Sequence, residues 1–263
     1  MSNADNFVIT RRRKKYKFAK FAEFNNCFEL KEWVKTCHCE EPQATKQFSK
    51  TTRHSTFQPF RVKGAGPKQQ VVLEIGAGSA LFLVELASRH PENFYIAIDI
   101  KGDRLYRGAR RATEEKVDNI VFIRSEIQHL PEIVPAHIVD EIWLTFSDPY
   151  PRKSDAKHRL TAPRYLELYR QVLRFDLRGG GIKTAPNQVG PGNGAGILHF
   201  KTDNQPLFDW SVEQFNENGW QIDELTRDLH ISDLPEHTKI MTSYEEKFVA
   251  DGLPIYYLNA RPS

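Results

Sequence analysis

The sequence contains no long run of hydrophobic residues. Its longest uninterrupted apolar runs, 80–84 and 94–98, are five residues each, whereas a helix needs about 20 apolar residues to span a bilayer. No apolar stretch follows the charged residues near the N-terminus, as it would in a secretory signal. The sequence therefore predicts no membrane span and no export, and it favours a cytoplasmic location.

Cysteine is also scarce, with three residues in 263. The odd number argues against a disulfide framework, and Cys37 and Cys39 have no second pair at the spacing of a zinc site. We therefore expect free thiols in a reducing compartment and no bound metal. No heptad pattern or obvious apolar edge signals a partner chain, so the sequence favours a monomer.

The net charge is small, at +3, but the basic residues are unevenly distributed. One ten-residue stretch near the N-terminus contains no acid and seven basic residues: Arg11, Arg12, Arg13, Lys14, Lys15, Lys17 and Lys20. Such a segment suits a polyanion such as nucleic acid. A solvated tail or a contact with anionic lipid would explain the same charges.

Short apolar runs alternate with amphipathic stretches from residue 71 onward. Strands are predicted at 71–75, 94–98, 120–123, 141–146, 197–200, 221–229 and 255–258, and helices at 80–88, 104–116, 164–175 and 205–216. Strands separated by helices pair in parallel through crossovers. The expected fold is α/β, with an open, mostly parallel seven-stranded sheet and helices on both faces.

The chain is predicted to have two parts. Residues 1–55 form a basic N-terminal extension with a weak helical pattern near 28–35, and residues 56–263 form the main domain. Within that domain, segment 178–196 (RGGGIKTAPNQVGPGNGAG) is rich in Gly, Pro and Asn and is long for a helix-to-strand connection. We expect a Gly-rich surface insertion there, either a lid or merely added length.

Two glycines follow the first predicted strand, in residues 74–78 (EIGAG), and a helix begins soon after them. Glycines here allow the backbone to turn tightly and approach a ligand. A dinucleotide site would have a third glycine where this chain has Leu81, which argues against a nicotinamide oxidoreductase. Glu74 would repel phosphate and attract an ammonium group, and Asp99, after the second strand, can accept hydrogen bonds from ribose hydroxyls.

This pattern resembles the S-adenosylmethionine site of Rossmann-like methyltransferases. The resemblance rests on the acid and two glycines after the first strand and on the acid after the second. It implies that Glu126, just after the third strand, contacts the adenine. The alternative is an ordinary glycine-containing turn in another α/β protein.

The fourth predicted strand brings Phe146, Ser147 and Asp148 to its carboxyl end, where open α/β sheets place their active sites. Pro149 and Pro151 keep the following residues out of a helix. Asp148 is thus expected on a rigid turn. A second basic stretch follows and suits contacts with phosphates: Arg152, Lys153, Lys157, His158, Arg159 and Arg164.

Residues 146–153 (FSDPYPRK), with His158-Arg159-Leu160 after them, are similar to the signature of bacterial tRNA (guanine-N(7)-)-methyltransferases. Segments 200–204 (FKTDN) and 242–245 (TSYE) continue the resemblance, which covers about residues 71–258. The family more often has Pro-Asp-Pro-Trp and then a lysine, where this chain has SDPY and Arg152. The Gly-rich insertion also differs from its compact members.

The resemblance implies a Rossmann-like enzyme that methylates the guanine at position 46 of tRNA, with S-adenosylmethionine as methyl donor. The implied cofactor residues are Glu74, Gly76, Gly78, Asp99, Glu126 and Asp148. Asp148 would also be catalytic, and the implied substrate residues are Arg152, Asp203, Thr242, Ser243, Tyr244 and Glu245. The carboxylates of Asp203 or Glu245 could accept hydrogen bonds from guanine N1 and N2.

The chemistry agrees with this set of residues. Guanine N(7) has a lone pair and no proton, so methyl transfer needs no general base and depends on positioning and on carboxylates near the developing positive charge. Two alternatives remain open: a methyltransferase that acts on another RNA or a small molecule, and a cofactor-binding regulator without catalysis.

Overall fold

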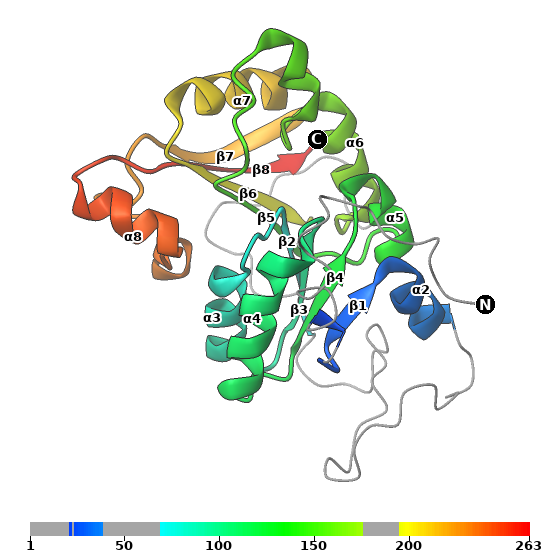
Figure 1. Cartoon of the computed structure of the whole chain (residues 1–263). Helices are drawn as coiled ribbons and strands as arrows, with labels where there is room; N and C mark the ends of the chain where they lie inside the picture. The colour runs from blue at the N-terminus through cyan, green and yellow to red at the C-terminus, as the bar shows by residue number, and fades with distance from the viewer. Residues whose placement is uncertain (1–20, 23, 39–68, 176–194) are drawn as a thin grey trace.

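The computed structural model describes residues 21–22, 24–38, 69–175 and 195–263 (Figure 1). The basic stretch at 11–20, Cys39 and most of the Gly-rich segment 178–196 lie outside these residues. The strands are β1 (Cys27–Glu29), β2 (Val71–Ile75), β3 (Phe94–Asp99), β4 (Ile120–Arg124), β5 (Glu141–Thr145), β6 (Ile197–Thr202), β7 (Trp220–Thr226) and β8 (Tyr256–Pro262). The helices are α2 (Leu30–His38), α3 (Leu81–Arg89), α4 (Gly102–Glu114), α5 (Leu130–Ile133), α6 (Pro163–Val172), α7 (Gln205–Glu217) and α8 (Ser243–Ala250).

The strands form one sheet of eight, in the order β1-β4-β3-β2-β5-β6-β8-β7. β8 pairs antiparallel with both β6 and β7, and the other neighbours are parallel. The predicted α/β open, mostly parallel sheet is confirmed, with one strand more than expected. The additional strand, β1, pairs with β4 at the edge, and its three residues are too few for a recognisable alternation.

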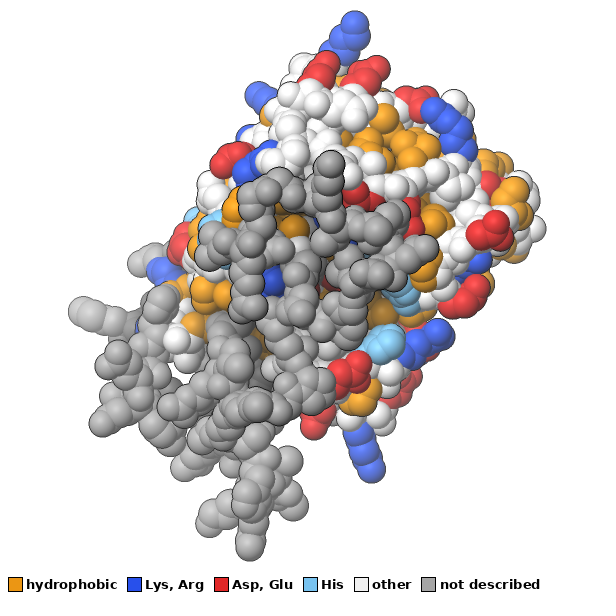
Figure 2. Space-filling model, turned by 180° about the vertical axis from the view of Figure 1, so that it is seen from behind, with side chains coloured by type: hydrophobic (Ala, Val, Ile, Leu, Met, Phe, Trp, Pro, Cys, Tyr) orange, Lys and Arg blue, Asp and Glu red, His pale blue; other side chains and the backbone are white. Residues whose placement is uncertain are grey.

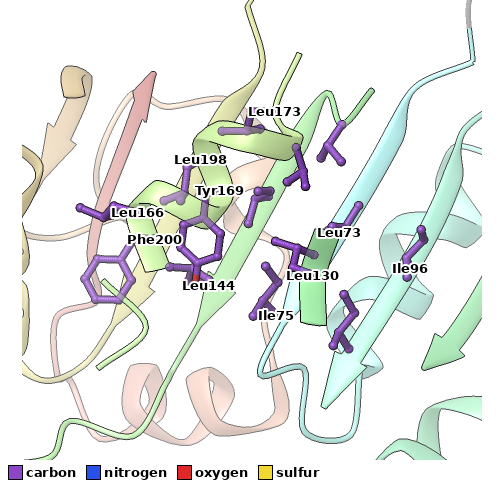
Figure 3. Close-up of a cluster of buried hydrophobic side chains, with 14 of the residues drawn as sticks. Leu73, Ile75, Ile96, Leu130, Leu144, Leu166, Tyr169, Leu173, Leu198 and Phe200 are labelled. Carbon is purple, nitrogen blue, oxygen red and sulfur yellow. The ribbon is translucent and has the colours of Figure 1, made fainter. Parts of the chain in front are cut away.

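Helices cover both faces of the sheet (Figure 1). Alternate residues of a strand point to opposite faces, so Leu73 and Ile75 belong to one hydrophobic cluster and Val72 to another. The first cluster includes side chains of α2, α5, α6 and α7, and Figure 3 shows Leu166 and Tyr169 of α6 packed against it. The second includes side chains of α3 and α4, with part of α8 against them.

The strand order changes direction between β2 and β5. The chain runs from β2 through β3 to β4 on one side, then continues with β5 and β6 on the other. In open α/β sheets, ligands bind beyond the carboxyl ends of the strands at such a point. A ligand site is therefore expected at the residues that follow β2 and β5.

The surface in Figure 2 has acidic and basic side chains interspersed, with hydrophobic side chains between them. Large hydrophobic side chains that are exposed include Phe175, Leu225, Ile231, Met241, Tyr244 and Leu253. Within the described ranges, no helix has the length and apolar character to cross a membrane. The same ranges contain no group of three or more His, Cys, Asp or Glu side chains placed to hold a metal ion.

Candidate active site

The turn between β2 and α3 forms the first part of the site. Gly76 and Gly78 have φ angles of 70° and 55°, in the left-handed region that favours glycine. The amides of Gly76 and Ala77 donate hydrogen bonds to the carbonyl of Ile98, at 2.9 and 3.1 Å. The turn is therefore tied to the end of β3.

Two close approaches fix this turn in place. A Cβ atom on Gly76 would lie 3.0 Å from Cδ1 of Leu160, and a Cβ on Gly108 of α4 would lie 2.4 Å from the carbonyl oxygen of Ser79. Helix α4 and the segment after β5 thus both contact the turn. Gly108 was not among the predicted site residues, although a glycine inside an amphipathic helix is a signal of close packing.

Asp99 ends β3 and is almost fully buried. Its Oδ2 accepts a hydrogen bond from the Gly78 amide at 2.8 Å, and its Oδ1 accepts one from the Lys101 amide at 2.7 Å. A carboxylate has about four acceptor positions, so the fixed group can still accept bonds from ribose hydroxyls. Glu126 is half-buried just after β4, the neighbour of β3, so the structure brings the two acids to adjacent strand ends.

Glu74, in β2, is 1% exposed. Its Oε1 accepts a hydrogen bond from the Thr145 hydroxyl at 2.6 Å, whereas its Oε2 has no partner among the described residues. Burial, with a smaller contribution from the charge of Asp99, raises the pKa of Glu74 to about 8, against the opposing effects of Thr145 and Lys201. A buried oxygen without a donor can accept a hydrogen bond from an ammonium group, which would favour the ionised form.

The turn after β5 presents Asp148, whose side chain is exposed. Phe146 and Tyr150 have φ angles of 48° and 42°, which residues other than glycine rarely adopt. The guanidinium of Arg159 donates to the carbonyls of Pro149 and Tyr150, both at 3.0 Å. These bonds hold the backbone on both sides of Tyr150, one of the two strained residues, and keep Asp148 at the edge of the sheet.

Arg159, one of the basic residues predicted to suit phosphate contacts, also has a structural role at the turn. Besides its two hydrogen bonds to the turn, its guanidinium lies 4.4 Å from the centre of the Trp210 ring. Arg152 and Lys153, by contrast, are exposed in the same segment. The basic stretch thus contains a structural arginine as well as exposed charges, a distinction that composition does not make.

Three other predicted substrate residues are exposed or half-buried near the same edge. Asp203 is exposed directly after β6, which neighbours β5, so it shares the edge with Asp148. Tyr244 is 62% exposed in the first turn of α8, and Thr242 caps that helix by accepting a hydrogen bond from the Glu245 amide at 3.0 Å. Ser243 is the first residue of α8, and its side chain lies outside the described set.

Glu245 differs from these residues because it is fully buried. Its oxygens accept hydrogen bonds from Lys201 at 3.2 and 3.3 Å, from His230 at 2.9 Å and from the Thr242 amide at 3.1 Å. A guanine would have to displace one of these donors to bind Glu245 directly. Asp203 is the better placed of the two acids predicted to contact the base.

Several known proteins resemble this chain. A family model described as "Putative methyltransferase" matches residues 68–186. The tRNA (guanine-N(7)-)-methyltransferase of Brevibacillus brevis is 35% identical over 195 residues, which cover 74% of this chain and 82% of the relative. The protein of the same name from Cytophaga hutchinsonii is 38% identical over 191 residues, or 72% of this chain and 78% of the relative.

A solved structure gives a more distant likeness. The 16S rRNA methyltransferase KamB has 17% sequence identity to this chain and a TM-score of 0.50. The superposition covers 75% of this chain and 89% of KamB. At this identity the likeness concerns the fold alone.

Proposed function

Because this chain belongs to the family of tRNA (guanine-N(7)-)-methyltransferases, we propose that it transfers a methyl group from S-adenosylmethionine to N(7) of guanine 46 in tRNA. The single observation that carries the proposal is the position of Glu74, a buried carboxylate beside a glycine turn at the point where the strand order of the sheet changes direction. We place this activity in the cytoplasm.

The residues at the ends of β2, β3 and β4 fit the methyl donor. Glu74 would accept a hydrogen bond from its amino group through the unpartnered Oε2, and Asp99 would bind the ribose hydroxyls. Glu126 would contact the adenine. The positive φ angles of Gly76 and Gly78 let the backbone approach the ligand without a side chain in between.

The residues after β5 and β6 fit the guanine and its tRNA. Asp148 and Asp203 are exposed at neighbouring strand ends, where their negative charges would favour the positive charge that develops on the base. The exposed ring of Tyr244 can stack on a base, and Arg152 can contact phosphate. Segment 242–245 would thus form the substrate side of the site.

The reaction itself places few demands on proton transfer. The lone pair of N(7) forms a bond to the methyl carbon while the bond from that carbon to sulfur breaks, so the sulfonium charge is lost as the base becomes positive. S-adenosylmethionine supplies the activated methyl group when it is bound. The protein contributes alignment of the two reactants and, through Asp148, a carboxylate near the reacting base.

The test is to incubate the protein with labelled methyl donor and tRNA that lacks 7-methylguanosine, and then to digest the product to nucleosides. We expect label in 7-methylguanosine. A tRNA transcript with adenine in place of guanine 46 is the matched control and should accept no label. Label in another nucleoside, or none in either substrate, would overturn the proposal.

A further inference from the structure

A buried lysine lies between the two halves of the site. Lys201, in β6, is 0% exposed, and its Nζ donates hydrogen bonds to the Ile240 carbonyl at 2.9 Å and to Glu245. Its Nζ also lies 5.2 Å from the centre of the Phe82 ring in α3. Burial of a charge is costly even when it is paired. An apolar residue would fill the same space without this cost, so the charge of Lys201 is expected to have a role beyond packing.

On the cofactor side, the charge of Lys201 faces Glu74. Lys201 is the register partner of Thr145 in the parallel pair β5–β6, and the Thr145 hydroxyl donates to Glu74. The groups that face Glu74 are Asp99 from β3, Thr145 from β5, Lys201 from β6 and the backbone of Leu83 in α3. Of these, Lys201 carries the positive charge, and it lowers the pKa of Glu74 against the effect of burial.

On the substrate side, Lys201 holds the start of α8. Glu245 receives the Lys201 hydrogen bonds and closes a capping box with Thr242, in which each residue accepts a hydrogen bond from the other's amide. His230 donates to the same carboxylate at 2.9 Å. Tyr244, adjacent to Glu245, is exposed beside this anchor. The position of the substrate segment 242–245 therefore depends on a charge supplied by the sheet.

We propose that Lys201 is a positioning residue that serves both halves of the site: it anchors segment 242–245 through Glu245, and it places a buried positive charge next to the Thr145–Glu74 pair that binds the methyl donor. The inference rests on the proposed function, which assigns those two ligands. It adds a residue that contacts neither ligand and whose loss impairs both.

The test uses K201M/E245Q, which removes both charges of the pair so that neither is left buried alone. Calorimetry with S-adenosylhomocysteine from pH 6.5 to 9.5 gives the ratio of variant to wild-type Kd, in which titration of the probe's own amino group cancels. We expect about a fivefold higher Kd at pH 7 and near wild-type affinity at pH 9.5, because Glu74 without Lys201 keeps its proton to higher pH. We also expect the KM for tRNA to rise about tenfold.

Arg174→Met is the matched control. It breaks a partly buried ion pair with Asp140, at 2.7 Å, next to the amino end of β5 and thus at the opposite edge of the sheet. We expect it to lower the unfolding temperature while both the KM for tRNA and the Kd ratio stay within about twofold of wild type. If K201M/E245Q does not fold, K201Q/E245Q keeps hydrogen-bonding groups without charge, and the same two measurements apply.

Two results would overturn the inference: an unchanged KM for tRNA, or a Kd ratio that does not depend on pH. Either result would mean that Lys201 and Glu245 form only a structural ion pair, as Arg174 and Asp140 do. Failure of the proposed function is distinguishable, because wild-type protein would then form no 7-methylguanosine whatever the variants do. If the wild type methylates tRNA and both readouts of the variant match it, the inference alone fails.

Discussion

The two halves of the site are built in opposite ways. On the cofactor side, Glu74 and Asp99 are buried and their carboxylates are held by Thr145 and by backbone amides. On the substrate side, Asp148 and Asp203 are exposed on turns beyond the strands. The first arrangement suits a small ligand that is enclosed, and the second suits a macromolecule that approaches from outside.

The two halves also differ in whether the residues proposed to bind a ligand are the ones that hold the local backbone. On the cofactor side, the carboxylate proposed to bind the ribose, Asp99, also holds the local backbone. On the substrate side, Arg159 holds the turn that carries Asp148, and Glu245 holds the helix that carries Tyr244. Substitutions of exposed substrate residues should therefore change activity without changing stability, whereas substitutions on the cofactor side should change both.

The largest effect is expected from Asp148→Asn, which keeps the shape of the side chain and removes its charge. Because Asp148 is exposed, the unfolding temperature should stay unchanged, while the single-turnover rate of 7-methylguanosine formation should fall about 100-fold. Asp251→Asn, at the exposed C-terminal end of α8, is the matched control and should keep the wild-type rate. A near wild-type rate for Asp148→Asn would remove Asp148 from the catalytic centre.

Glu74→Ala should have the next largest effect. It deletes the proposed acceptor for the amino group of the methyl donor, so calorimetry should show a Kd for S-adenosylmethionine at least about tenfold higher. Affinity for tRNA should stay as in the wild type, since Glu74 lies beneath the surface that the tRNA would contact. Unchanged binding of the cofactor would contradict the assignment.

The raised pKa of Glu74 also predicts that a proton is released when the cofactor binds. With its pKa raised to about 8, this carboxyl group is mostly protonated at pH 7 in the free protein, and an ammonium partner would favour the ionised form. Affinity should therefore rise as the pH approaches 8. Calorimetry in two buffers of different ionisation enthalpy should detect close to one released proton in the wild type and fewer in Glu74→Gln.

The sequence predicted the fold better than the interactions that hold the site residues in place. Strand ends are marked locally by apolar runs followed by glycine or acid, which is why the sequence placed Glu74, Asp99 and Asp148 near the carboxyl ends of their strands, where they lie in the structure. The ion pair of Lys201 and Glu245 joins residues 44 apart in sequence, and no local pattern predicts it. Glu245 was therefore expected to be a ligand residue and proved to be fully buried.

The remaining differences have similar causes. Strand β1 has three residues and gains its place by pairing with β4, not by its own pattern. Arg159 is one of several basic residues in its segment, and only the fold shows which of them faces the turn. Interactions between distant segments thus account for what the sequence did not predict.

Removal of residues 1–20, which lie outside the described residues, tests whether the basic N-terminal stretch contributes to tRNA binding. The seven basic residues between 11 and 20 suit a polyanion such as nucleic acid, which under the proposed function is tRNA. Their removal should weaken tRNA binding about fivefold at moderate salt and flatten its salt dependence, because fewer counterions are released. The Kd for S-adenosylmethionine should not change. An unaltered salt slope would show that these charges do not contact tRNA.

The smallest effect is expected from Gly108→Ala, which tests whether packing under the glycine turn sets cofactor affinity. The added Cβ would meet the Ser79 carbonyl at 2.4 Å, so α4 or the turn must shift, at a cost of about 1–3 kcal/mol in the free energy of unfolding. Part of that shift should displace the amide of Gly78 from Asp99 and raise the Kd for S-adenosylmethionine about threefold.

Gly196→Ala is the matched control for this substitution. Its Cβ would meet the Val139 carbonyl at 2.7 Å, a similar clash near the amino end of β6, far along the strand from the turn. We expect a comparable loss of stability in urea unfolding with no change in cofactor Kd. If both variants raise the Kd equally, affinity follows global stability, and the cofactor half of the site is not the locally preorganised unit that its buried carboxylates indicate.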